Sequence, residues 1–305
     1  GGAAVTVLFA LIILYAPLVT TAPALEHGPD PEPCSYPSGV PVLTYHQITD
    51  SPSKYAATPG KLRDDLRRLY DAGFFLIQPC DLENGLQNVP FHRRPVMITF
   101  DDGWEDNFRY IENGTDRSLD PNCAVAIVND FIEDHPDFGR GVTFFISWDK
   151  VPFGSQTEEK LNQVLDMGHA IGNHTADHRS FMEIHPTTYY TQVIPALDSF
   201  RRRLGLRTSS INALAYPGGK LPAAAGAEEV LAGMEYMGRE AVVQGYLVDG
   251  AVENLSRVYE NGTGRFRISR LDMALYSVNR LLGWNNLMEE SIARSSLHDP
   301  LPWRP

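Results

Sequence analysis

Short apolar runs alternate with amphipathic segments between residues 40 and 219, and this alternation limits the chain to a few folds. Each run has the length and composition of a buried strand, and most are followed by apolar residues at helical spacing. Strands that alternate with helices form a parallel sheet covered by helices, either open or closed as a barrel. The predicted strands are 40–46, 74–79, 95–100, 141–147, 169–173 and 212–219, and the predicted helices are 58–73, 123–135, 158–168 and 189–205.

Polar side chains with catalytic chemistry follow several of these strands. Asp101 and Asp102 come directly after "PVMITF". His46, His174 and Tyr216 end three other strands. In open sheets and in barrels alike, functional sites form at the carboxyl ends of parallel strands. We therefore expect these side chains to meet at one site.

Two histidines four residues apart, His174 and His178, indicate a metal site. On a helical turn this spacing places both imidazoles on one side. With a carboxylate from Asp101 or Asp102 they make a set of two histidines and one carboxylate, which leaves the open positions that a catalytic metal needs. Non-haem iron oxygenases use the same ligand types. Those sites usually carry a His-x-Asp pair on one strand, and Asp-Asp followed by His-x-x-x-His does not match them.

Composition limits the partners of the chain. The net charge is −12 and no basic stripe occurs beyond residues 200–205, so nucleic acid is excluded as the expected partner. The three cysteines, Cys34, Cys80 and Cys123, allow one disulfide, and the sequence does not say which pair would form it. The oligomeric state stays open.

The first 25 residues carry no charge, which is typical of a secretory signal peptide or a membrane anchor. Residues 26–38 are rich in proline and are predicted to form a tether. A single domain is expected at 39–285, with a C-terminal tail at 286–305. This organisation predicts an extracytoplasmic protein, secreted or anchored, that meets a membrane only through its N-terminal segment.

Three short motifs together indicate a family. "TFDDG" (99–103), "GNHTADH" (172–178) and "AYPGG" (215–219) resemble, in order and spacing, the motifs of NodB-type polysaccharide deacetylases, carbohydrate esterase family 4. "LTYHQI" (43–48) adds a similarity to the branch that deacetylates poly-N-acetylglucosamine. The resemblance spans roughly residues 40–273 and implies a distorted (β/α) barrel of the NodB type.

The resemblance also implies roles for individual residues. Asp102, His174 and His178 would hold a divalent metal, with zinc expected and Ni²⁺, Co²⁺ and Fe²⁺ open. Asp101 would be the general base. The backbone N–H of Tyr216, in the turn with Pro217 and Gly218, would stabilise the oxyanion, while Asn173 and Thr175 would orient the histidines.

The chain departs from the family pattern at two places. Many members carry an arginine before the proline of the third motif, which braces the base; Ala215 and Tyr216 stand there, and Arg267 is predicted to replace it. Members commonly have a Leu-x-His motif for the general acid, whereas this chain has only "SSLHD" around His298. We therefore predict that His46 is the acid.

Other features allow more than one interpretation. Trp104 is predicted to stack on a sugar ring because it follows the first motif, whereas Trp148 and His169 are predicted core residues. Residues 104–141 form either an additional surface loop and helix or a rim of the sugar cleft.

The sequence thus predicts a metal-dependent hydrolase that removes N-acetyl groups from an extracellular or cell-envelope polysaccharide. An O-acetyl esterase, or a deacetylase of peptidoglycan or chitin, would use the same site. A catalytically inactive carbohydrate-binding protein is the alternative from another functional class.

Overall fold

The computed structural model describes residues 39–51, 53–223, 226–260 and 262–283. All of them belong to the compact unit that spans residues 35–305. The predicted signal peptide or anchor (1–25), the tether (26–38) and the tail (286–305) lie outside the described residues. Within the described ranges, no helix is both long and apolar enough to cross a membrane.

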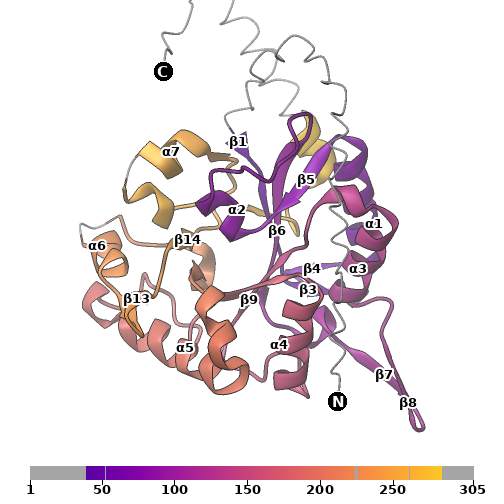
Figure 1. Cartoon of the computed structure of the whole chain (residues 1–305), viewed down its shortest axis with the longest axis horizontal. Coiled ribbons are helices and arrows are strands. Elements are labelled where there is room, and N and C mark those ends of the chain that lie inside the picture. Colours follow the sequence, from indigo (N-terminus) through magenta and orange to yellow (C-terminus); the bar gives the residue numbers. More distant parts are fainter. Residues whose placement is uncertain (1–38, 52, 224–225, 261, 284–305) are drawn as a thin grey trace, which may run out of the picture. The chain divides into compact units, whose positions relative to one another are not determined.

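Parallel strands form the central sheet (Figure 1). Across the sheet the order is β14 (Gln244–Tyr246), β11 (Ala213–Ala215), β10 (Ala170–Asn173), β9 (Thr143–Ile146), β6 (Arg94–Asp102), β2 (Val42–Tyr45) and β16 (Leu271–Asp272). An eighth strand, β5 (Phe74–Ile77), pairs with the first part of β6. The runs predicted from the sequence correspond to β2, β5, β6, β9, β10 and β11, which confirms the α/β class; β14 and β16 were not predicted.

A short segment before β16 joins the two ends of the sheet. The Ile268 N–H donates to Gly245 O and the Leu247 N–H donates to Ile268 O, both at 2.8 Å. Three residues later, Leu271 pairs with Leu43 of β2. The sheet therefore curls back on itself, and the predicted distorted (β/α) barrel is confirmed.

Helices pack around the outside of this sheet (Figure 1). They are α1 (Pro59–Asp71), α2 (Pro79–Glu83), α3 (Ala124–Asp134), α4 (Thr157–Asp166), α5 (Tyr190–Leu204), α6 (Ala227–Ala232) and α7 (Leu255–Glu260). The start of α1 follows from its sequence: the Thr58 side chain accepts a hydrogen bond from the Lys61 N–H at 3.1 Å, as an N-cap does. The four helices predicted from apolar spacing are α1, α3, α4 and α5.

Strand β6 separates two hydrophobic cores. Val96, Ile98 and Phe100 belong to the core between sheet and helices, whereas Met97 belongs to the core that also holds Tyr246 and Ile268. This is the alternation that a strand imposes on its side chains. Continued to the end of β6, it places residue 101 on the side of Met97 and residue 102 on the opposite side.

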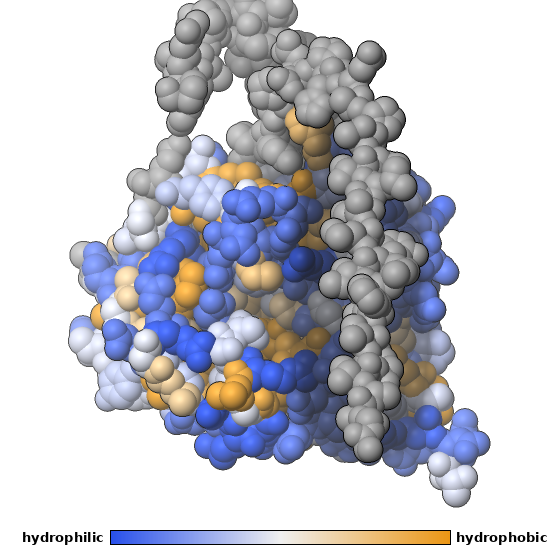
Figure 2. Space-filling view, viewed as in Figure 1, coloured by the Kyte–Doolittle hydropathy of each residue, from blue (hydrophilic) through white to orange (hydrophobic). Residues whose placement is uncertain are grey.

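The segment 104–141 divides into an exposed part and a buried part. β7 (Tyr110–Asn113) and β8 (Asp116–Leu119) form an antiparallel hairpin that projects from the lower right of Figure 1 and is mostly hydrophilic in Figure 2. Helix α3, in contrast, buries residues 124–128 against the core. The hairpin is thus a surface addition, while α3 is part of the domain.

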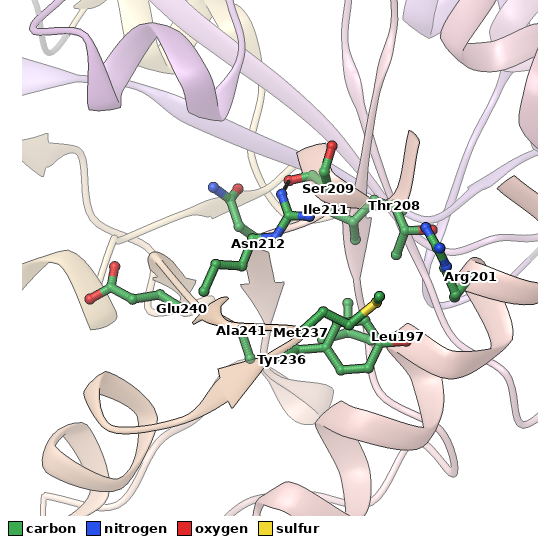
Figure 3. Close-up of a pocket in the computed structure, with 11 residues that line it drawn as sticks. Leu197, Arg201, Thr208, Ser209, Ile211, Asn212, Tyr236, Met237, Glu240 and Ala241 are labelled. Carbon is green, nitrogen blue, oxygen red and sulfur yellow. Dashed lines mark hydrogen bonds between the residues drawn. The ribbon is translucent and has the colours of Figure 1, made fainter. Parts of the chain in front are cut away.

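A second hairpin, β12 (Glu235–Tyr236) and β13 (Arg239–Glu240), packs against α5 (Figure 3). The Tyr236 hydroxyl donates to Asp198 of α5 at 2.9 Å. Leu197, Ile211 and Met237 are among the residues that line a cavity of about 20 Å³ between them. A space of this size holds a water molecule but no sugar, so it belongs to the packing of the hairpin.

Candidate active site

Asp102, His174 and His178 converge at the carboxyl edge of the sheet. Asp102 ends β6 and His174 follows β10. One oxygen of Asp102, Oδ1, lies 3.3 Å from His174 Nε2 and 3.1 Å from His178 Nε2. Among the described residues this is the one group of three or more histidine, cysteine and acidic side chains close enough to hold a metal ion.

The backbone of this site adopts rare conformations. Asp102 has φ 74°, Thr175 has φ 76° and His178 has φ 52°, all in the left-handed region that residues other than glycine seldom adopt. Residues 174–178 are not helical, so the helical turn predicted for the histidines is wrong. The left-handed residues bring the two rings to a centroid distance of 4.9 Å instead. Such strain is characteristic of functional sites.

The left-handed turn at Asp102 explains how two adjacent carboxylates serve one site. Strand alternation alone would direct Asp101 and Asp102 to opposite faces. The positive φ of Asp102 re-aims its carboxylate toward the histidines, while Asp101 keeps the direction of the strand. The two side chains therefore reach one site from different sides.

Hydrogen bonds fix the turn that carries the histidines. His174 Nδ1 lies 2.8 Å from the Ala215 carbonyl oxygen, so Nδ1 carries the proton and Nε2 presents a lone pair. Asn173 accepts from the Thr175 N–H at 2.8 Å, and the Thr175 hydroxyl accepts from the His178 N–H at 3.1 Å. Asn173 and Thr175 thus occupy the supporting positions predicted for them.

The donor set fits a divalent metal. Asp102 Oδ1 is buried and has no hydrogen-bond partner among the described residues, which is costly unless a cation pairs with it. An ionised carboxylate and two imidazole nitrogens are ligands that zinc prefers.

Arg270, and not Arg267, braces Asp101. The guanidinium of Arg270 donates to both oxygens of Asp101 at 2.8 Å, and Arg270 is fully buried. Burial alone would raise the pKa of Asp101, but Arg270 and then His174 outweigh it and lower that pKa. The prediction for Arg267 is wrong, because its guanidinium pairs with Glu228 and donates to the Leu221 carbonyl.

We expect Arg270→Met to destabilise the protein far more than Arg267→Met. The first change leaves the Asp101 carboxylate buried without its partner, which typically costs about 3–5 kcal/mol. The second breaks a pair that is partly exposed to solvent, where the loss is typically about 1 kcal/mol. Denaturant unfolding of both variants measures the difference, and equal losses would contradict the bracing role of Arg270.

Tyr216 cannot supply the oxyanion N–H. Its N–H donates to Tyr246 O of β14 at 3.1 Å, and its buried side chain donates from the hydroxyl to Phe266 O at 2.9 Å. Pro217 has no N–H, and the Gly219 N–H donates to Tyr216 O at 2.8 Å. This leaves the N–H of Gly218, whose φ of 72° suits glycine, as the candidate donor of this turn.

His46 follows β2 and lies near the base, since its charge contributes to lowering the pKa of Asp101. Its Nδ1 is buried and has no hydrogen-bond partner among the described residues. Two residues that sequence reasoning missed hold its segment. Asn107 donates to His46 O at 2.8 Å, and Asp106 accepts from the Ile48 N–H at 3.1 Å. Their position directly after "TFDDGWE" was the available signal.

The remaining predicted side chains also have defined places. Trp104 lies in the site, but its indole N–H donates to Asp102 Oδ2 at 2.8 Å. Trp148 packs on Phe200 with ring centroids 5.0 Å apart. His169 is buried, and burial lowers its pKa to about 4, so it is an uncharged core residue.

Comparisons with known proteins agree with this geometry. The profile of the polysaccharide deacetylase family matches residues 88–237, which include the metal-ligand candidates, Asp101 and the Gly218 turn. Residues 88–237 thus match a polysaccharide deacetylase domain of the NodB type. His46 and Arg270 lie outside the matched range. His46 was predicted from the sequence, whereas Arg270 was located by the structure.

One curated relative of this deacetylase domain is YxkH of Bacillus subtilis (strain 168), whose name assigns it to the polysaccharide deacetylases. The two are 23% identical over 186 residues, which cover 60% of this chain and 58% of YxkH. The matched part is thus little more than half of that relative.

Solved structures share the fold. The Streptococcus pyogenes deacetylase PplD, in complex with acetate, gives a TM-score of 0.61 at 18% identity and covers 81% of this chain and 98% of PplD. BC0361, a polysaccharide deacetylase from Bacillus cereus, gives a TM-score of 0.58 at 16% identity, and the match covers 80% of this chain and 68% of BC0361. IcaB from Ammonifex degensii gives a TM-score of 0.51 at 17% identity, and the match covers 76% of this chain and 91% of IcaB. At these identities the similarity shows the fold.

Proposed function

We propose that this protein is a metal-dependent hydrolase that removes N-acetyl groups from an extracellular or cell-envelope polysaccharide. The proposal rests mainly on the observation that two adjacent carboxylates have different partners. Asp102 faces two histidines, while Asp101 is held by Arg270. Asp102 is thus available to bind a metal, and Asp101 is available to accept a proton.

Asp102, His174 and His178 would hold the metal, which supplies Lewis-acid polarisation of a carbonyl and lowers the pKa of water to about 7. Asp101 accepts the proton of the attacking water; Arg270 keeps it ionised and oriented. The Gly218 N–H donates to the oxygen that gains negative charge. His46, on the same rim, donates a proton to the departing amine.

The proposed substrate class rests on a sequence motif. The motif "LTYHQI" resembles the poly-N-acetylglucosamine branch, and His46 lies in that motif. We therefore propose poly-N-acetylglucosamine as the substrate, and an extracytoplasmic location because of the uncharged N-terminal segment. Peptidoglycan, chitin oligomers and O-acetylated glycans are the competing substrates for the same site.

Acetate release from a panel of acetylated glycans tests the function. The panel contains poly-N-acetylglucosamine, chitin oligomers, peptidoglycan fragments and O-acetylated xylan. We expect acetate from the N-acetylated polymers and most from poly-N-acetylglucosamine. Release only from xylan would indicate an O-acetyl esterase, and binding to glycans without any release would indicate an inactive carbohydrate-binding protein.

Removal of the metal is expected to abolish activity reversibly. A chelator competes for an ion held by only three protein ligands, and added Zn²⁺ or Co²⁺ should restore the lost activity. Acetate release before chelation, after chelation and after readdition measures the effect. Full activity in excess chelator would exclude the metal-dependent mechanism.

A further inference from the structure

The two oxygens of the Asp102 carboxylate have different surroundings. Oδ1 faces His174 and His178 and has no hydrogen-bond partner among the described residues. Oδ2 accepts the indole N–H of Trp104 at 2.8 Å and lies 3.9 Å from Lys150 Nζ. One oxygen is therefore free for a cation, and the other is already engaged by the protein.

The backbone brings Trp104 back to its neighbour. Asp102 and Gly103 have φ values of 74° and 73°, and this pair of left-handed residues reverses the chain after β6. The Phe153 N–H donates to Gly103 O at 2.8 Å and fixes the turn. A Cβ atom at position 103 would lie 3.0 Å from Ile146 Cδ1, which is a tight contact, and the positive φ also favours glycine.

Lys150 completes the arrangement from the segment after β9. Its Nζ lies 4.0 Å from the centroid of the Trp104 ring, within the range of a cation–π interaction. The ammonium therefore covers one face of the indole that was predicted to stack on a sugar. Its side chain is 28% exposed, so its charge is only partly screened by solvent.

We propose that Trp104 and Lys150 form a clamp on Asp102 Oδ2, which makes Asp102 a one-oxygen metal ligand. This inference rests on the proposed metal site. A carboxylate held in this way cannot rotate to offer both oxygens, so an additional coordination position stays open for water and substrate. Outer partners of ligating carboxylates commonly change metal affinity or activity by about 10–100-fold.

The two members of the clamp have opposite effects on metal affinity. Trp104 orients the ligand, so Trp104→Phe, which retains a ring and removes the N–H, weakens Zn²⁺ binding by about 10–100-fold. Lys150 repels a cation, so Lys150→Met tightens Zn²⁺ binding by about 3- to 10-fold. A role in packing alone would not produce opposite signs.

Competition for Zn²⁺ with a chromophoric chelator measures both dissociation constants. The visible absorption of Co²⁺-loaded protein reports coordination number, and we expect it to weaken in Trp104→Phe as the freed carboxylate adds a second oxygen. Trp148→Phe is the matched control, since it also removes an indole N–H but packs on Phe200, away from Asp102.

The binding measurements test the clamp and the metal site separately. Unchanged Zn²⁺ affinity in Trp104→Phe, or a shift of both variants in one direction, overturns the clamp while the metal site stands. A wild-type protein that binds neither Zn²⁺ nor Co²⁺ overturns the metal site and the proposed function. If Trp104→Phe does not fold, Lys150→Met decides alone, and unchanged or weaker binding there overturns the clamp.

Discussion

Asp101→Asn is expected to lower the rate of deacetylation by about 10²–10⁴-fold while Zn²⁺ stays bound. An amide has nearly the shape of the carboxylate but cannot accept the proton of water. The site otherwise keeps its ligands, because Asp101 bonds to Arg270 and is not one of the three ligand candidates. Acetate release and metal content of the purified variant measure the two effects separately.

Asp102→Ala, His174→Ala and His178→Ala serve as the contrast, because each should lose metal together with activity. Asp81→Asn is the control for a buried carboxylate elsewhere, since Asp81 caps α2 and accepts from the Gln78 N–H at 2.8 Å. Equal metal loss in Asp101→Asn and Asp102→Ala would contradict the separate roles of the two carboxylates.

His46→Ala is the second large expected effect. A histidine placed beside the leaving amine can act as a general acid, and such an acid contributes about 10²–10⁴-fold in rate. Metal content should not change, because His46 is not among the three ligand candidates. Steady-state kinetics together with metal analysis test this expectation.

His298→Ala separates two possible general acids. His298 belongs to the C-terminal tail, outside the described residues, and we expect its replacement to change the rate little. If His298→Ala lost most turnover and His46→Ala did not, the acid would lie in the tail. The assignment to the poly-N-acetylglucosamine branch would then lose its main support.

The strands and helices with strong apolar patterns were predictable from the sequence. β6 carries an apolar run that only Thr99 interrupts, and α1 combines a threonine N-cap with leucines at helical spacing. Asp101, Asp102 and His174 could be brought together because parallel strands place their carboxyl ends at one edge. Pattern and topology were sufficient for this part of the site.

Very short strands were the first source of error. β14 has three residues and β16 has two, which is too short for a periodic pattern. Without these strands, the sequence could not show that Arg270 enters the barrel while Arg267 remains at its surface. Nor could it show that the Tyr216 N–H is engaged by β14, which leaves Gly218 as the candidate donor.

Left-handed backbone conformations were the second source of error. Thr175 and His178 adopt positive φ although neither is glycine, and a β-branched threonine does so only rarely. The spacing of His174 and His178 therefore led to the two histidines that do lie together, although the helical turn assumed for them is absent. The contact of Trp104 with Asp102 depends on the same kind of turn and was equally hidden.

The most direct test of the account counts both products of the reaction. Zinc-loaded protein is incubated with poly-N-acetylglucosamine, and released acetate and new free amines are measured in the same sample. The account predicts equal amounts of both from the wild type, and neither from chelated protein or from Asp101→Asn. Correctly folded, zinc-loaded wild type that releases neither acetate nor amine from any N-acetylated glycan would contradict it.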